Sequence, residues 1–111
     1  MHFYSVKKGM RCMQSARDCR IPFIQFVESA GGDLRPRAGA AVGGMGHFAE
    51  SGRQFYEITE LSKLNIPTVT VAFGTATAGG AYQPGMSDYN IFVKNQADVA
   101  LAGPPLVQMA T

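Results

Sequence analysis

The chain has 111 residues, of which 46% are apolar and 16% charged, and ten Lys and Arg stand against eight Asp and Glu. This composition is typical of one small globular domain and excludes a disordered chain. A net charge of +2 gives no reason to expect binding to nucleic acid or to a membrane surface. We find no run of about 18 apolar residues for a membrane span, and no apolar segment of a secretory signal at the start.

The first half of the chain predicts a helix, a strand and a loop. Residues 5–19 are expected to be helical, with an apolar stripe made of Val6, Met10, Met13 and Ala16. Pro22 ends this helix, and residues 23–27 (FIQFV) then suit a strand. Residues 34–47 are rich in glycine, alanine and arginine without a period, which indicates an irregular loop.

A second helix is predicted over residues 48–64, with Phe55, Ile58 and Leu61 on its inner face. We expect its outer face to carry Glu57, Glu60 and Lys63. Asn65 is predicted to end it in a left-handed conformation. A buried strand over 68–73 follows, and Gly74 is expected to break it.

The last third predicts four further elements. Residues 78–81 (AGGA) should open a short helix, and residues 90–94 and 98–102 should form two strands. A final helix is expected to start at Pro104, where a missing N–H costs nothing. The order helix, strand, loop, helix, strand, helix, strand, strand, helix predicts an α/β protein with right-handed crossovers.

The two cysteines, Cys12 and Cys19, lie seven positions apart on the first predicted helix. Two helical turns separate their Cα atoms by roughly 10 Å, which is too far for a disulfide. We therefore interpret them as buried free thiols of a reducing compartment. Two Cys and two His without ligand spacing also predict that the chain holds no metal.

Two predicted strands each run into a pair of glycines. The first is followed by Ser29-Ala30-Gly31-Gly32, and the second by Thr77-Ala78-Gly79-Gly80. Such turns present bare backbone N–H groups, and two convergent donors suit the oxygen that becomes negative when a thioester enolises. A purely structural turn explains the glycines about equally well. The chain carries no Ser-His-Asp pattern, no paired-carboxylate motif and no P-loop.

The segments ESAGG, TAGGAY, PGMSD and AGPPLV, together with SVKKGMRCMQSARDC and GRQFYEITELSKLNIP, resemble the carboxyltransferase (beta) subunits of biotin-dependent acyl-CoA carboxylases. The resemblance extends from about Tyr4 to Thr111. The form GAYQPGMSD is most similar to the methylcrotonyl-CoA and general acyl-CoA types. The run ESAGGDL departs from the usual ESGGA or ESAGA of the family, because Gly32 stands where alanine is usual.

The resemblance implies a crotonase-like ββα spiral, present here as a partial domain. Residues 1–111 would be the central part of an N-terminal acyl-CoA carboxyltransferase domain. The implied reaction moves CO2 from carboxybiotin to the α-carbon, or the vinylogous γ-carbon, of an acyl-CoA, while backbone N–H groups hold the enolate. The resemblance implies Gly79 and Gly80 as the catalytic donors. The implied substrate-binding residues are Ser29, Ala30, Gly31, Gly32, Ala78, Ala81 and Tyr82.

The implied co-substrate is biotin on a partner carrier domain, and the implied partners are a biotin carboxylase or biotin carrier subunit and further copies of the full-length subunit. The resemblance implies a cytoplasmic enzyme, or a mitochondrial-matrix enzyme in a eukaryote. The isolated chain is expected to be inactive. Two alternatives stay open: an enoyl-CoA hydratase or isomerase-like enzyme, with Glu28 as its acid, and a CoA-binding fragment without turnover.

Other polar residues have ordinary explanations. His47 is interpreted as a loop histidine, and Lys7, Lys8 and Arg11 as a solvated helix face rather than contacts to CoA phosphates. Two arginines flank the first glycine pair and have a better claim to such phosphates, namely Arg35 and Arg37. Tyr82 suits an acyl pocket or a core position equally well. Asp88 is expected to brace the strand at 90–94.

Overall fold

The computed structural model describes residues 3–30 and 44–111. Its elements, in chain order, are the helix α1 (Phe3–Cys19), the strand β1 (Phe23–Ser29), the helix α2 (Gly44–Lys63), the strand β2 (Thr68–Thr77), the 3-10 helix η2 (Ala78–Ala81), the helix α3 (Tyr82–Met86), the strands β3 (Tyr89–Phe92) and β4 (Asp98–Ala100), and the helix α4 (Pro104–Ala110). This order confirms the predicted α/β sequence of elements. None of the described helices is long and apolar enough to cross a bilayer.

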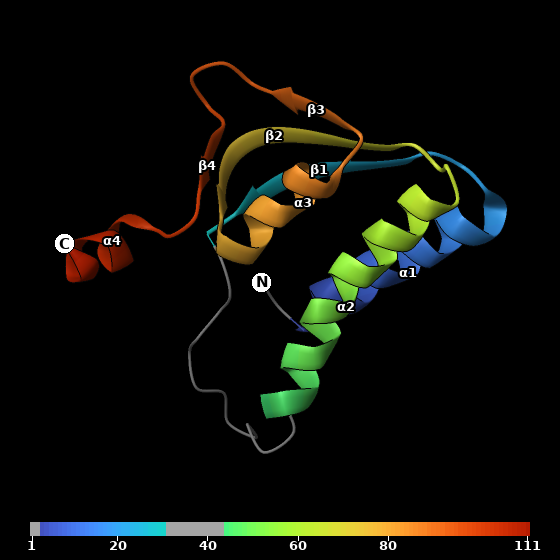
Figure 1. The fold of residues 1–111 in the computed structure, drawn as a ribbon, viewed down its shortest axis with the longest axis horizontal. Coiled ribbons are helices and arrows are strands. Elements are labelled where there is room, and N and C mark those ends of the chain that lie inside the picture. Colours follow the sequence, from blue (N-terminus) through green and yellow to red (C-terminus); the bar gives the residue numbers. More distant parts are fainter. Residues whose placement is uncertain (1–2, 31–43) are drawn as a thin grey trace.

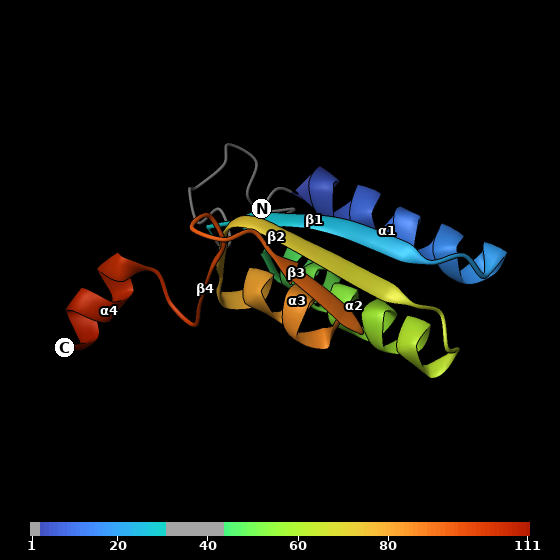
Figure 2. The same cartoon turned by 90° about the horizontal axis from the view of Figure 1, so that it is seen from above.

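All the strand pairs described are parallel, and β2 lies at the centre of the sheet (Figure 1). The strand β1 pairs along one edge of β2, β3 pairs with its first half, and β4 pairs with its last residues. The helices α2 and α3 lie on one side of β2, whereas α4 and the C-terminus lie apart from the other elements (Figures 1 and 2). Because β1 and β2 run in the same direction, their carboxyl ends meet at one edge of the sheet.

The core lies between the helices and one face of the sheet. It contains Met13 and Ala16 from α1 and Ile58 and Leu61 from α2, and each of them is at most 3% exposed. The stripe predicted on the first helix is therefore confirmed, since Val6 and Met10 are buried as well. Asn65 has a φ of 57°, and the Ile66 N–H donates to the Leu61 carbonyl at 3.0 Å, which confirms the predicted left-handed helix end.

The opposite face of the sheet is apolar and exposed. We call it the open sheet face, and its exposed large side chains are Ile24, Phe26, Phe73, Tyr89 and Ile91. The register pairs Ile24 with Val69 and Val69 with Tyr89, so these side chains lie on one side across three strands. Phe26 is 72% exposed and Tyr89 66% exposed, although both are large aromatic residues.

Two predicted boundaries are wrong by four residues, and the last two strands, β3 and β4, each end two residues before their predicted ends. The strand β2 does not break at Gly74 but continues to Thr77. The side chain of Glu28 occupies the space where a Gly74 Cβ would lie, only 2.7 Å from it, so the glycine makes room for a neighbouring strand. The helix α2 begins at Gly44, so residues 44–47, including His47, are helical rather than part of a loop. Glycine disfavours a helix by only about 1 kcal/mol, which other contacts override. Residues 34–43 lie outside the described part.

The cysteines are not buried, contrary to the prediction. Both Cys12 and Cys19 are free and exposed, because they lie off the apolar stripe of α1 that faces the core. The absence of a disulfide between them agrees with the helical spacing. Their exposure could not follow from their spacing, which fixes a distance along the helix but not the face that the core covers.

The prediction for Glu57 is also wrong, because its side chain is only 1% exposed rather than on the outer face of α2. The Arg17 guanidinium lies 3.0 Å from its Oε2, and that of Arg53 lies 3.6 Å from its Oε1. The ion pair with Arg17 joins α1 to α2. A carboxylate is buried here because cations from two helices lie beside it.

We expect Arg17→Ala to lower the free energy of unfolding of the chain by about 2–3 kcal/mol, because it removes a cation from a buried carboxylate. Lys63→Ala is the matched control, since the exposed Lys63 lies 4.0 Å from a carboxylate that is not fully buried, that of Glu60. That variant should change the stability by less than about 0.5 kcal/mol. Urea unfolding of both variants measures the difference, and equal effects would contradict the assignment.

Candidate functional site

The carboxyl ends of β1 and β2 contact each other at one edge of the sheet. Ser29 pairs with Ala76 at the last position of the β1–β2 register. A Cβ built on Gly80 would lie 2.9 Å from the Cβ of Ser29. This proximity places η2, the segment after β2, beside the end of β1. The first glycine pair, Gly31 and Gly32, lies outside the described residues, as do Arg35 and Arg37.

The chain turns sharply at Ala78, between the strand β2 and the helix η2. Ala78 has a φ of 53°, in the left-handed region that non-glycine residues rarely adopt. Such a residue costs about 1 kcal/mol or more and persists only where its surroundings enforce it. A left-handed residue followed by right-handed helical residues aligns successive N–H groups into a small concave nest, which suits a negatively charged oxygen. Ala78 is exposed.

Gly79 and Gly80 differ in their surroundings, although the sequence presents them as a pair. Gly80 is buried, and its lack of a Cβ allows the close approach of Ser29. Gly79 is exposed, and a Cβ there would meet only Phe55 Cζ at 3.8 Å, an ordinary contact. In a 3-10 helix that starts after Thr77, the first internal bond uses the N–H of residue 80. The N–H groups of Ala78 and Gly79 therefore precede the helical bonds.

An aromatic pair flanks Gly79. The Phe55 ring from α2 and the Tyr82 ring from α3 meet edge to face, with their centroids 5.3 Å apart. Tyr82 is 56% exposed, so it is not a core residue, and Phe55 is half-buried. The sequence pattern identified Phe55 only as part of the inner face of α2. Its position beside Gly79 depends on how α2 packs against η2, which the helical period does not reveal.

The remaining predicted site residues surround this turn. Ser29 is half-buried and contacts Gly80, Ala30 is exposed just beyond β1, and Ala81 closes η2. Glu28, the acid that a hydratase-like enzyme would need, lies over Gly74. In the part of the chain described, no cluster of three or more His, Cys, Asp or Glu side chains could hold a metal ion.

Asp88, expected to brace the strand at 90–94, bonds the first residue of β2. Its Oδ2 accepts hydrogen bonds from the Thr68 N–H at 2.9 Å and from the Thr68 hydroxyl at 3.1 Å. The Asp88 N–H in turn donates to the Thr68 Oγ1 at 3.0 Å. These bonds therefore join the residue just before β3 to the first residue of β2.

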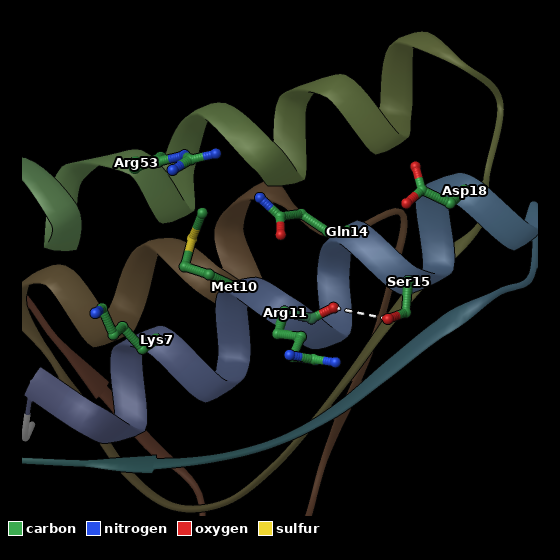
Figure 3. A pocket seen from close by; sticks show the side chains of 7 residues that line it. All are labelled: Lys7, Met10, Arg11, Gln14, Ser15, Asp18 and Arg53. Carbon is green, nitrogen blue, oxygen red and sulfur yellow. Dashed lines mark hydrogen bonds between the residues drawn. The ribbon is translucent and has the colours of Figure 1, made fainter.

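A groove with a volume of about 530 Å³ lies between α1 and α2 (Figure 3). Its lining residues are Lys7, Met10, Arg11, Gln14, Ser15, Asp18 and Arg53. Met10 and Gln14 extend toward α2, whereas Arg11 extends away from it (Figure 3). The cations of this groove do not converge on one point, and Lys7, Lys8 and Arg11 are exposed. This arrangement favours the solvated helix face predicted for them.

Comparison with known proteins identifies the family. The model of the carboxyl transferase domain matches residues 2–111, so the chain belongs to the carboxyl transferase domain family. The chain is 44% identical over 108 residues to a probable biotin-dependent acyl-coenzyme A carboxylase beta2 subunit of Mycobacterium tuberculosis. It is 44% identical over 107 residues to a probable mitochondrial methylcrotonoyl-CoA carboxylase beta chain of Drosophila melanogaster. These matches cover 97% and 96% of the chain.

The fold is also similar to that of a solved relative. The beta subunit of geranyl-CoA carboxylase from P. aeruginosa superimposes with a TM-score of 0.75 at 41% identity and covers 90% of the chain. The expected crotonase-like α/β class, in partial form, is thereby confirmed. The chain spans 19% of the length of the M. tuberculosis relative, 18% of the Drosophila relative and 18% of the solved subunit.

Proposed function

We propose that the chain is the central part of the N-terminal, acyl-CoA-binding domain of a biotin-dependent acyl-CoA carboxyltransferase. The observation that carries this proposal is the family match, which extends over residues 2–111. The names of the relatives, acyl-CoA, methylcrotonoyl-CoA and geranyl-CoA carboxylase subunits, support an acyl-CoA substrate. The methylcrotonoyl-type relative also agrees with the subtype that the segment GAYQPGMSD resembles.

We place the proposed site at the exposed turn over Ala78 and Gly79 rather than at Gly79 and Gly80, because the first internal bond of η2 uses the Gly80 N–H. The N–H groups there would hold the thioester oxygen of the acyl-CoA and stabilise the negative charge that develops on it as the α-carbon loses its proton. Ser29, Ala30, Gly31 and Gly32 would form the facing wall. The ring of Tyr82 would line the acyl chain beside Gly79. This edge contributes backbone dipoles and needs no side-chain base of its own.

Biotin would arrive as carboxybiotin on a separate carrier chain and supply both the CO2 and, once this is released, a base. We assign none of the described residues to it. A biotin carboxylase or carrier subunit and further copies of the full-length subunit are the proposed partners. The proposed compartment is the cytoplasm, or the mitochondrial matrix in a eukaryote, since the Drosophila relative carries a mitochondrial name.

The test is a transfer assay with a longer subunit, in which this chain replaces the matching 108 residues of the M. tuberculosis relative. We expect this chimera to form carboxylated acyl-CoA from carboxybiotin and methylcrotonyl-CoA. The isolated chain should form none, because its relatives are about five times longer. Product from the isolated chain would overturn the proposal. Hydration of an enoyl-CoA by the chimera would favour a hydratase-like enzyme. If the folded chimera binds acyl-CoA but transfers no carboxyl group, the chain is a non-catalytic fragment.

A further inference from the structure

The turn that carries Gly79 needs support from outside η2. The helix η2 has four residues, its N-cap Thr77 forms no side-chain capping bond, and Gly79 itself is exposed. Backbone donors stabilise an oxyanion only within a narrow range of distances, about 2.7–3.1 Å. A displacement of about 1 Å in a reacting group can reduce a rate by about a hundredfold. Contacts that fix its position must therefore come from the neighbouring segment.

Ser87, just after α3, is the centre of a hydrogen-bond network. Its hydroxyl donates to the Gln83 carbonyl at 2.8 Å and forms a short hydrogen bond with the Thr70 hydroxyl. The Gln25 side-chain amide donates to Thr70 Oγ1 at 2.8 Å and to Ser87 Oγ at 3.3 Å. Thr70 is 0% exposed, so this network lies inside the protein, between α3 and the strands β1 and β2.

The protons of this network can be assigned in only one direction. A serine hydroxyl has one proton, and that of Ser87 is used by the Gln83 carbonyl. Thr70 must therefore donate to Ser87, while both oxygens accept from the Gln25 amide. Each hydroxyl proton of this network therefore has an acceptor. A fully bonded network of this kind holds its members in one arrangement.

Two neighbouring residues of the same segment contact other elements. The Gln83 Nε2 donates to Gln54 Oε1 on α2 at 2.9 Å, and Gln54 is buried. Asp88 bonds both the N–H and the hydroxyl of Thr68 at the start of β2. Three polar side chains within six residues thus join this segment to β1, to β2 and to α2.

We propose that residues 82–88 (YQPGMSD) act as a clamp, in which Gln83 and Ser87 are positioning residues that hold η2 and the N–H of Gly79 in place. This inference rests on the proposed function for its catalytic consequence, but its structural part can be tested without turnover. The nearest atom to the Cβ position of Gly79 belongs to Phe55 and not to either of these side chains. Both act through the helix α3, which continues η2 without a break.

The first test is amide hydrogen exchange of the full 111-residue chain. Ser87→Ala should raise the exchange rates of the Gly80 and Tyr82 amides, which are bonded within η2, by about tenfold or more. The exchange rates of Ile58 and Leu61 in α2 should change less than about threefold. The matched control is Ser15→Ala, because the exposed Ser15 hydroxyl also donates to a carbonyl four residues earlier, but within its own helix α1. Equal acceleration throughout the chain in Ser87→Ala would overturn the clamp.

The second test measures kinetics in the chimeric subunit described above. Ser87→Ala should lower kcat by about ten- to a hundredfold and change the KM for acyl-CoA less than about threefold, since the thioester oxygen and not the CoA body is displaced. Ser87→Thr keeps a hydroxyl and should recover most of the rate. The pH profile should not move, because the network of Gln25, Thr70, Ser87 and Gln83 carries no titrating group.

The two arms fail in different ways. If the chimera transfers no carboxyl group but Ser87→Ala still accelerates exchange only at Gly80 and Tyr82, the proposed function fails and the clamp stands. If Ser87→Ala leaves exchange and kcat unchanged, the clamp fails and the function stands. Where Ser87→Ala does not fold, Gln83→Ala cuts the bond to Gln54 alone, and it is compared with Gln108→Ala on the exposed helix α4.

Discussion

Replacing Gly79 with valine is expected to lower the carboxyl-transfer rate of the chimeric subunit by about 10²–10³-fold, as when an oxyanion loses one of its donors, because the oxygen can no longer reach the N–H of residue 79. The added side chain would fill the space that the thioester oxygen must enter. The stability should change by less than about 1 kcal/mol, because Gly79 is exposed and a Cβ there meets only Phe55 at 3.8 Å. Steady-state kinetics and thermal unfolding of the same preparation measure both effects.

The matched control is Gly52→Val, a glycine of α2 with no atom within 4 Å of its Cβ position. This variant should retain the full transfer rate. Normal activity of Gly79→Val would contradict the assignment of its N–H to the oxyanion. If the Gly79→Val subunit loses activity only because it unfolds, as thermal unfolding would show, Gly79 is needed for packing instead.

Replacing Gly80 with alanine should, in contrast to Gly79→Val, lower the stability of the chain. A Cβ at this position would lie 2.9 Å from Ser29 Cβ and 3.1 Å from Ser29 Oγ, so the end of β1 must move away from η2. Overpacking of this kind costs about 1–3 kcal/mol. Urea unfolding of the 111-residue chain measures the loss of stability.

A second substitution provides the control for this steric explanation. Ser29→Gly removes the atoms that the new methyl group meets, so the double variant should recover most of the lost stability. Simple additivity of the two changes would argue that Gly80→Ala acts through the backbone conformation. A Gly80→Ala variant as stable as the parent would contradict the close packing of the two strand ends.

The helices and strands could be predicted because each depends on a local period. The stripe from Val6 to Ala16 determines which side of α1 meets the core, and Asn65 with Pro67 marks the end of α2. Glu57 could not be predicted as buried. Its partner Arg17 is 40 positions earlier in the chain, and the pair forms only when α1 packs against α2.

The position of the proposed site could be predicted from the sequence, but the different roles of Gly79 and Gly80 could not. The sequence places two glycines after each of two strands, and parallel pairing then brings the strand ends together. The sequence gives no signal that residue 80 must be glycine because Ser29 lies too close for a side chain. It also does not show that Gly79 is exposed beside Phe55. The role of Gln83 and Ser87 is equally hidden, because their partners Gln54, Thr70 and Gln25 come from three other elements.

The open sheet face has a thermodynamic consequence for the chain on its own. Its large side chains, such as Phe26 and Tyr89, are already hydrated in the folded state. Unfolding can therefore expose less new apolar surface than is usual for a protein of this length. The heat-capacity increment of unfolding grows with the newly exposed apolar area. For this chain it should therefore fall below the usual value of roughly 12–15 cal/mol/K per residue. The stability curve of the isolated chain would accordingly be flat and low.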